Sequence, residues 1–247
     1  MIRFESVTKK FGTGESALSD ISLTIEPGEF IFLTGPSGSG KTTFFRLLTR
    51  EMLPTTGAIH INELNITKLS RGKIPHLRRR IGVIFQDLKL LTDRTIFENI
   101  LLPLQIAGID NKRSHSRVIE IMSQVGIEQH KDKFPVQLSG GELQRVAIAR
   151  AIVFAPQIII ADEPTGNLDS NTSWEIVKLL EEINDAGTTV LMTTHNTDIV
   201  KALGRRLIIL ENGTIAKDEP ASKKKKDPKP ESIHEEKKPE VPKKEHK

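Results

Sequence analysis

The sequence predicts an α/β domain built on a mainly parallel β-sheet. Four apolar runs rich in β-branched and aromatic residues, at positions 30–34, 81–85, 158–161 and 189–194, have the composition of buried strands. Near-continuous apolar strands suit a sheet covered by helices on both faces. Stretches with helical character lie between them, at 41–51, 113–125, 142–154 and 173–186. Strands that alternate with helices in this way predict a parallel arrangement.

Each predicted strand is followed by a residue suited to ligand binding. Gly35, Gln86, Asp162 and His195 come directly after the four apolar runs. In a parallel sheet, ligands bind at the carboxyl ends of the strands. We therefore expect these four residues to meet at one edge of the sheet.

Two regions depart from this alternation. Residues 1–29 contain short strand-like runs with a turn at Pro27 and Gly28, which predicts an N-terminal antiparallel β flank. Residues 87–154 are richer in helical pattern, so we expect an inserted helical subdomain there. With both additions, the predicted globular domain spans residues 1–220.

The net charge of the chain is concentrated at its C-terminal end. The formal net charge is +4, and residues 221–247 contain ten Lys against six acidic residues. This Lys/Glu/Pro-rich stretch has almost no apolar side chains, so we expect a disordered tail. Because residues 1–220 then carry no net charge, nucleic acid is not an expected partner of the domain. The run of four lysines at 223–226 leaves a nucleic-acid or scaffold role of the tail, or its contact with anionic lipid, as further hypotheses.

Composition also excludes several classes of protein. The sequence has no cysteine, which rules out disulfides, thiolate metal sites and cysteine nucleophiles. No apolar run approaches the roughly 18 to 20 residues of a membrane-spanning helix. The first residues lack the basic and apolar segments of a secretory signal, so we expect a cytoplasmic protein.

The loop after the first apolar run carries a phosphate-binding motif. Residues 35–42 fit the pattern G-x-x-x-x-G-K-[ST], between a predicted strand and a predicted helix. Glycines allow successive backbone N–H groups to point at phosphate oxygens, and Lys41 would reach the β- and γ-phosphates. Thr42 would offer its hydroxyl to Mg²⁺. A simple Gly/Ser linker would not need Lys and Thr at these positions. The motif predicts a P-loop NTPase (RecA-like) core with ATP-binding residues Gly35, Pro36, Ser37, Gly38, Ser39, Gly40, Lys41, Thr42 and Thr43.

Two acidic residues complete the predicted site. Asp162 ends a predicted strand and would coordinate Mg²⁺, either directly or through water. Glu163 is then placed to deprotonate the attacking water. An acidic turn without function is the alternative, and the phosphate loop makes it the weaker one.

A second helix N-terminus with phosphate-binding potential follows Leu138. Ser139 and Glu142 form the S-x-x-E pattern of a capping box, which would be a purely structural role. The same geometry exposes free N–H groups and a serine hydroxyl, which can bind phosphate. One chain would then carry two phosphate-binding helix ends and one Lys-Thr loop. This surplus is explained if each chain completes the site of a partner.

The order of these motifs resembles that of ATP-binding cassette (ABC) ATPases over residues 1–218. Residues 138–142 resemble the signature of that family, standing between its two Walker motifs. The resemblance implies a homodimer in which two cassettes pair head to tail around two Mg-ATP molecules. Ser139, Gly140, Gly141 and Glu142 would form the signature that meets the ATP bound by the partner.

The resemblance assigns roles to four further residues. Gln86 would touch Mg²⁺ and the attacking water, and His195 would contact the γ-phosphate. Asp169 would lie at the dimer seam, and Phe11 would stack on adenine. A packing role for Phe11 and a structural role for His195 are the alternatives. Arg145, Arg150 and Trp174 are expected to be solvated or packing residues.

Within that family, the segment after Gln86 resembles the FtsE group of bacterial cell-division ATPases. The resemblance rests on Asp87, Leu90 and Leu91, followed by the run 93–95 of sequence Asp-Arg-Thr. It implies an integral membrane partner, FtsX, a place on the inner face of the cell membrane, and control of cell-wall hydrolases. Residues 164–169 are shared with lipoprotein-releasing and macrolide-exporting ATPases. The energy subunit of such an exporter is therefore the alternative function.

Overall fold

The computed structural model describes residues 1–12 and 14–222. Its larger sheet has the strand order β10-β9-β3-β8-β7-β6. Neighbouring strands from β9 to β6 run parallel and only β10 runs antiparallel, so the predicted mainly parallel sheet is confirmed. The strands are β3 (Phe30–Thr34), β6 (Ile81–Ile84), β7 (Ile158–Ala161), β8 (Thr189–Met192), β9 (Arg206–Glu211) and β10 (Thr214–Glu219).

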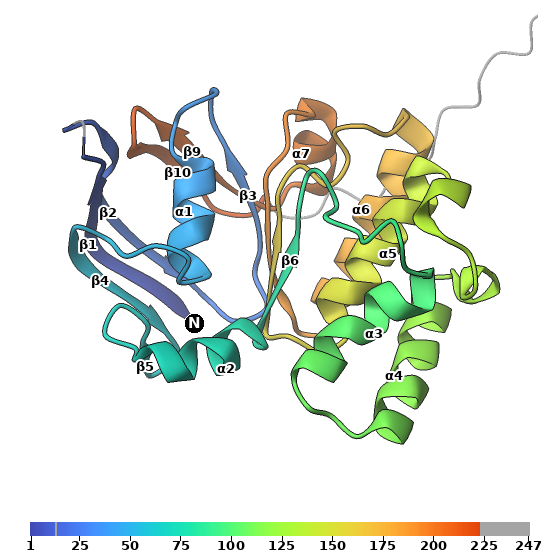
Figure 1. The fold of residues 1–247 in the computed structure, drawn as a ribbon. Coiled ribbons are helices and arrows are strands. Elements are labelled where there is room, and N and C mark those ends of the chain that lie inside the picture. The colour runs from blue at the N-terminus through green and yellow to red at the C-terminus, as the bar shows by residue number, and fades with distance from the viewer. Residues whose placement is uncertain (13, 223–247) are drawn as a thin grey trace, which may run out of the picture.

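A second sheet forms the predicted antiparallel flank, with strand order β2-β1-β4-β5. Strands β1 (Ile2–Lys10) and β2 (Ser16–Ile25) fall within the predicted range. Strands β4 (Thr56–Ile61) and β5 (Leu64–Asn65) come from beyond it, and β4 pairs with β1 through Ile2 and Ile61. The prediction missed them because this pairing joins segments far apart in sequence. The smaller sheet and the helical group form the two ends of the molecule in Figure 1.

The helices cover the larger sheet and form the inserted group between β6 and β7. That group contains α3 (Ile96–Ile106), α4 (Asn111–Gln124) and α5 (Gly140–Ile152), together with 3-10 turns at Glu128–His130 and Pro135–Gln137. The expected helical insertion is therefore present. The remaining helices are α1 (Lys41–Leu48), α2 (Ile74–Arg78), α6 (Ser170–Asp185) and α7 (Thr197–Leu203), with a 3-10 turn at Arg71–Lys73.

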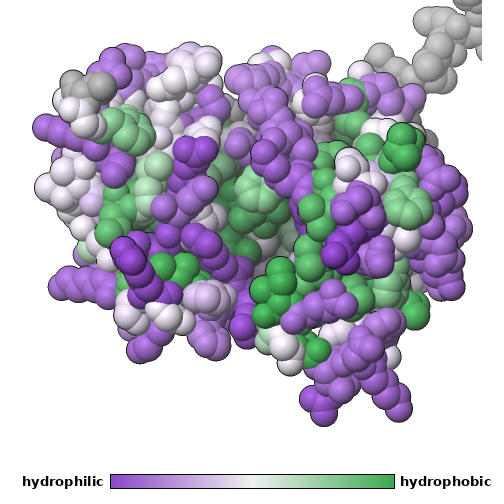
Figure 2. Space-filling view, viewed as in Figure 1, coloured by the Kyte–Doolittle hydropathy of each residue, from purple (hydrophilic) through white to green (hydrophobic). Residues whose placement is uncertain are grey.

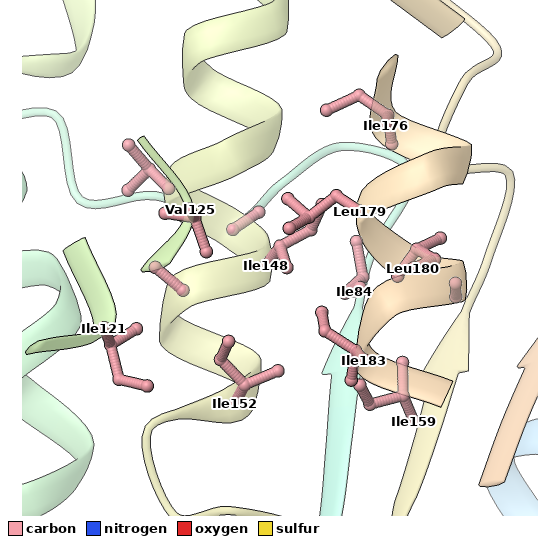
Figure 3. Packing of buried hydrophobic residues seen from close by; sticks show 14 of the residues in the cluster. Ile84, Ile121, Val125, Ile148, Ile152, Ile159, Ile176, Leu179, Leu180 and Ile183 are labelled. Atoms are coloured by element: carbon pink, nitrogen blue, oxygen red, sulfur yellow. The ribbon is translucent and has the colours of Figure 1, made fainter. Parts of the chain in front are cut away.

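Alternate residues of the central strands face two separate hydrophobic clusters. Phe30 and Phe32 of β3 pack with the cluster formed by the helical group and α6, whereas Ile31 and Leu33 pack with α1 and the smaller sheet. Successive side chains of a strand point to opposite faces, so one short strand contributes to both cores. Figure 3 shows Ile148 of α5 beside Leu179 of α6 in the first cluster. This packing fixes α5 and α6 relative to the sheet.

The described chain continues two residues past the predicted domain boundary at 220. The Ser222 N–H donates a 2.8 Å hydrogen bond to the Gly204 carbonyl. The rest of the predicted tail, residues 223–247, lies outside the described residues. Within the described part, no helix is both long enough and apolar enough to cross a membrane.

Candidate functional site

A cavity of about 690 Å³ opens where the parallel strands end at their carboxyl edge. Gly35 follows β3 and Asp162 follows β7 directly, whereas Gln86 and His195 lie two and three residues beyond their strands. The cavity brings together most of the predicted site residues. Its lining includes Phe11, Ser37, Gly38, Ser39, Gly40, Lys41, Thr42, Thr43, Gln86, Asp162, Glu163 and His195.

The phosphate loop folds around the ammonium group of Lys41. Lys41 Nζ donates hydrogen bonds to the carbonyls of Gly35 at 2.7 Å and Pro36 at 3.0 Å. The Gly35 and Pro36 carbonyls therefore hold the ammonium in place. With two of its three protons bound, Lys41 keeps one donor for an anion in the cavity.

Two glycines of the loop, Gly35 and Gly40, allow a close backbone approach that a larger residue would block. A Cβ at Gly35 would lie 2.1 Å from the Leu210 carbonyl oxygen. Gly40 has φ +107°, and a Cβ there would lie 2.5 Å from the Ala17 carbonyl oxygen. Ser39 is buried, and its hydroxyl oxygen has no hydrogen-bond partner among the described residues. A loop with a tight backbone and an unpaired buried hydroxyl matches the predicted phosphate cradle.

Gly40→Ala should destabilise the protein far more than Gly38→Ala. Both glycines have positive φ, but nothing lies within 4 Å of a Cβ added at Gly38. The left-handed backbone alone costs a non-glycine residue about 1–2 kcal/mol, and only the Gly40 variant adds a backbone clash. Urea denaturation measures the difference in free energy of unfolding. Equal losses for the two variants would show that the approach to Ala17 is unimportant.

The acidic side of the cavity is organised by a threonine. Thr193, fully buried directly after β8, donates its hydroxyl proton to Asp162 Oδ1 at 2.8 Å. The same hydroxyl oxygen accepts a 2.8 Å hydrogen bond from the Glu163 backbone N–H. Thr193 thus fixes both acidic residues. The sequence placed it at the end of a strand, but nothing marked its hydroxyl as the link between two carboxylates.

The side chains of Glu163 and His195 are in direct contact, which no sequence pattern indicated. His195 Nε2 lies 2.6 Å from Glu163 Oε1, with side-chain exposures of 63% and 19%. Glu163 also has φ +47°, an uncommon backbone conformation that is often found at functional sites. Both side chains line the cavity, and the contact with His195 holds the Glu163 carboxylate there. This arrangement suits proton transfer from a bound water to Glu163.

The cavity offers an oxygen donor set that fits Mg²⁺. Thr42, Gln86 and Asp162, which carry a hydroxyl, an amide oxygen and a carboxylate, all line it. The described residues contain no group of three or more acidic or histidine residues arranged to bind a metal. Mg²⁺ is commonly held by one or two carboxylates together with substrate phosphates, so these few oxygens suffice.

The predicted signature residues lie outside this cavity. Ser139 is exposed and caps the N-terminus of α5, where its hydroxyl oxygen accepts from the Glu142 backbone N–H at 3.4 Å. Glu142 Oε2 in turn accepts from the Ser139 N–H and hydroxyl, each at 2.7 Å. The capping box is therefore formed, and the Glu142 side chain is turned back onto its own helix. Ser139 and Gly140 are left exposed at this end of the helix.

The capping box should make stability depend on pH through Glu142. Hydrogen bonds from the Ser139 hydroxyl and backbone N–H hold the pKa of Glu142 below its ordinary value. This contribution is complete above the unfolded-state pKa and is lost as pH falls through the folded-state pKa. Glu142→Gln, which keeps an acceptor oxygen, should flatten the fall in urea midpoint below about pH 4.5. Glu182→Gln, at an exposed position of α6, is the control. An unchanged acid profile in Glu142→Gln would contradict the assignment.

Asp169 lies beside the signature because two helix N-termini meet. Asp169 caps α6 and accepts from the Thr172 N–H at 3.0 Å. A Cβ added at Gly141 would lie 2.5 Å from the Thr172 side chain, so α5 and α6 approach closely there. The Thr172 hydroxyl and backbone N–H hold the pKa of Asp169 below its ordinary value. Asp169 and the signature thus share one exposed surface.

Several residues of the site carried no recognisable signal in the sequence. Strand β2 begins beside the phosphate loop, and the turn between β9 and β10 lies nearby. Neither segment contains a motif. Both segments line the same cavity as Phe11, whose side chain is 45% exposed. The residues concerned are Glu15, Ser16, Ala17, Asn212 and Gly213.

Comparison with known proteins identifies the family to which this site belongs. The sequence profile described as ABC transporter matches residues 18–166, which include the phosphate loop, the signature and both acidic residues. The chain belongs to the ABC family of ATPases. The resemblance stated from the motifs is therefore confirmed.

Similar ABC proteins cover almost the same length of chain. The Cell division ATP-binding protein FtsE of Bacillus subtilis is 49% identical over 89% of this chain and 96% of that protein. The FtsE of Escherichia coli strain K12 is 45% identical over 87% of this chain and 97% of that protein. Among solved structures, the dimeric post-hydrolysis state of the ATP-binding cassette MJ0796 bound to ADP and Pi is 35% identical. It superposes with a TM-score of 0.80 over 90% of this chain and 100% of that one.

Proposed function

We propose that the chain binds Mg-ATP in the cavity and hydrolyses it as a homodimer, as the ATPase subunit of a bacterial cell-division complex. One observation carries the catalytic part. The Lys41 loop and the Glu163–His195 pair face each other across one cavity, on the carboxyl edge of a parallel sheet. A phosphate cradle opposite a general base is the arrangement needed to move a phosphoryl group to water.

Each residue that lines the cavity at the proposed phosphate and water positions would have a defined role in this reaction. Lys41 balances charge on the β- and γ-phosphates, and the loop N–H groups orient them. Mg²⁺, held by Thr42, Gln86 and Asp162, would neutralise charge on the phosphate oxygens. Glu163 accepts a proton from the water whose oxygen attacks the γ-phosphorus, as the bond to the ADP oxygen breaks. His195 holds the Glu163 carboxylate in line, and Thr193 fixes the backbone beneath it.

The position of the signature supports a dimeric site. Ser139 and Gly140 are exposed and line no part of the cavity that holds Lys41. In a head-to-tail dimer, the signature of one chain would close over the ATP held by the other, with Asp169 at the seam. The likeness to a cassette dimer bound to ADP and Pi supports this assembly.

The similarity to FtsE proteins supports the cell-division role. Curated relatives named Cell division ATP-binding protein FtsE reach 44–49% identity in Bacillus subtilis, Streptococcus pneumoniae, Mycobacterium tuberculosis and Escherichia coli. The chain would then act at the inner face of the cell membrane, bound to the integral membrane protein FtsX. Contact of the tail with anionic lipid belongs to the same proposal. The energy subunit of an exporter remains the alternative.

A groove beside β6 is the surface we assign to the membrane partner. It has a volume of about 360 Å³ and lies between the smaller sheet and the helical group, where apolar residues are exposed in Figure 2. Phe85, 42% exposed, lines it, and Leu91 is 38% exposed on the segment that follows. Leu90 is partly buried against the core, so its substitution would disturb folding. The groove is lined by Thr49, Glu51, Arg78, Arg79, Ile81, Gly82, Val83, Phe85, Pro103, Arg150, Ala151 and Phe154.

Phe85→Ala and Leu91→Ala should weaken recovery of FtsX in a pull-down by about tenfold or more. Truncating a well-packed aromatic anchor at an interface typically costs at least 2 kcal/mol. The matched control is Ile119→Ala, since Ile119 is 47% exposed but lies on α4, outside the groove. If both groove variants recovered as much FtsX as Ile119→Ala does, the assignment of the groove to FtsX would be wrong. Recovery of an exporter permease in place of FtsX would favour the alternative function.

A further inference from the structure

Arg150, near the end of α5, binds the backbone of the segment that follows Gln86. Its Nη1 donates to the Lys89 carbonyl at 2.6 Å, and its Nη2 donates to the Leu88 carbonyl at 2.5 Å. Within the described residues Arg150 forms no ion pair, so these carbonyls are the partners of its charge. The contacts of Arg150 are thus more specific than the solvated or packing role expected from the sequence.

The segment held by Arg150 has an uncommon backbone. Leu88 and Lys89 have φ of 56° and 50°, two consecutive non-glycine residues in the left-handed region. Each such residue costs of order 1–3 kcal/mol and persists only where the surroundings enforce it. The planar fork of a guanidinium, bound to both carbonyls, is a suitable restraint. A single lysine ammonium lacks this fixed two-pronged geometry.

The far end of the same segment is tied to α3. Asn99, 1% exposed, accepts from the Leu91 N–H at 2.8 Å and donates to the Leu91 carbonyl at 3.0 Å. Its amide also donates to the carbonyls of Arg94 and Thr95. Residues 88–95 are therefore fastened to two helices of the inserted group, and Gln86 lies just before the fastened stretch.

Helix α5 thus links two distant parts of the proposed ATP machinery. Ser139 caps its first turn, and Arg150 lies eleven positions later, a rise of roughly 16 Å along the helix. The first end faces a partner's nucleotide in the proposed dimer. The second end holds the segment that carries Gln86 into the chain's own cavity. A shift of α5 would move both ends together.

We propose that Arg150 is a positioning residue that sets the place of Gln86 in the ATP site through the Leu88 and Lys89 carbonyls. The proposal rests on the proposed function, because Gln86 matters only if ATP is hydrolysed in this cavity. Losing the restraint releases residues 87–89 and leaves the phosphate loop unchanged. The turnover rate therefore falls while ATP affinity is kept.

The test compares Arg150→Lys and Arg150→Met with Arg145→Lys, using the full-length protein. Arg145 is a matched control on the same helix, since it donates at 3.0 Å to the Val125 carbonyl and pairs with Glu175. We expect both Arg150 variants to lose about tenfold or more in kcat with less than about a twofold change in KM for ATP. Amide hydrogen exchange at residues 86–91, measured without nucleotide, should accelerate. Arg145→Lys should match the wild type in all three measurements.

Arg150→Lys keeps the positive charge and tests the proposal if Arg150→Met does not fold. Wild-type rates and unchanged exchange at 86–91 in folded Arg150→Lys would overturn the proposal. So would a loss confined to KM, or an equal loss in Arg145→Lys. If the wild type itself hydrolyses no ATP, the proposed function fails. In that case the exchange comparison still decides whether Arg150 holds the segment.

Discussion

Glu163→Gln is expected to lower the rate of ATP hydrolysis by a factor on the order of 10² to 10⁴, the usual contribution of a general base. The amide has nearly the shape of the carboxylate but cannot take the proton of the attacking water. Thr193 bonds to the Glu163 backbone N–H and not to its side chain, so this support survives the substitution. ATP should therefore bind and remain uncleaved.

The visible consequence of Glu163→Gln should be a stable dimer in Mg-ATP. Size-exclusion chromatography with light scattering distinguishes a monomer from a dimer directly. Glu181→Gln is the control, because Glu181 also loses an ion pair, with Arg205 at 2.7 Å, but lies away from the cavity. Normal hydrolysis in Glu163→Gln, or no dimer with ATP bound, would count against the assigned role.

Lys41→Ala should weaken ATP binding by between about tenfold and a hundredfold. Lys41 is the one Lys or Arg among the described residues that line the cavity. A charge-assisted hydrogen bond contributes about 1.5–3 kcal/mol, and each 1.4 kcal/mol is a factor of ten in affinity. Isothermal titration with Mg-ATP measures the change. The substitution also removes the two bonds from Nζ to the Gly35 and Pro36 carbonyls, so unfolding must be followed alongside.

Thermal melting with and without ATP separates loss of binding from loss of folding in Lys41→Ala. A variant that melts near the wild-type temperature without ATP, but gains no stability when ATP is added, has lost the ligand alone. Lys201→Ala, at an exposed position of α7, serves as the control for removing a lysine. If Lys41→Ala bound ATP with wild-type affinity, the loop would not be the phosphate cradle.

Local patterns in the sequence predicted the parallel sheet and the gathering of its ligand-binding residues. The apolar runs at 30–34 and 158–161 match β3 and β7 because their strand character is continuous and bounded by polar residues. Gly35 and Asp162 then follow from the rule that parallel strands end at one edge. The phosphate loop was recognisable because its glycines and Lys41 stand at fixed offsets.

Interactions between distant segments were not visible in the sequence. Strand β4 is defined by pairing with β1, which no local pattern reveals. Helix α3 contains Pro103, which obscured its helical pattern, although Thr95 and Glu98 form a capping box at its start. Thr193, Asn99 and Arg150 act through hydrogen bonds to residues 4 to 62 positions away. Their roles depend on the folded arrangement.

The shared site between two chains is tested most directly by mixing two inactive variants. Lys41→Ala damages the phosphate loop, and Ser139→Arg blocks the exposed signature. Each homodimer would have two damaged sites, whereas a mixed dimer would combine both defects in one site and leave the other intact. Random pairing makes half of the dimers mixed, so the mixture should recover up to roughly a quarter of the wild-type ATPase rate. A mixture no more active than its separate components would contradict the two-chain site.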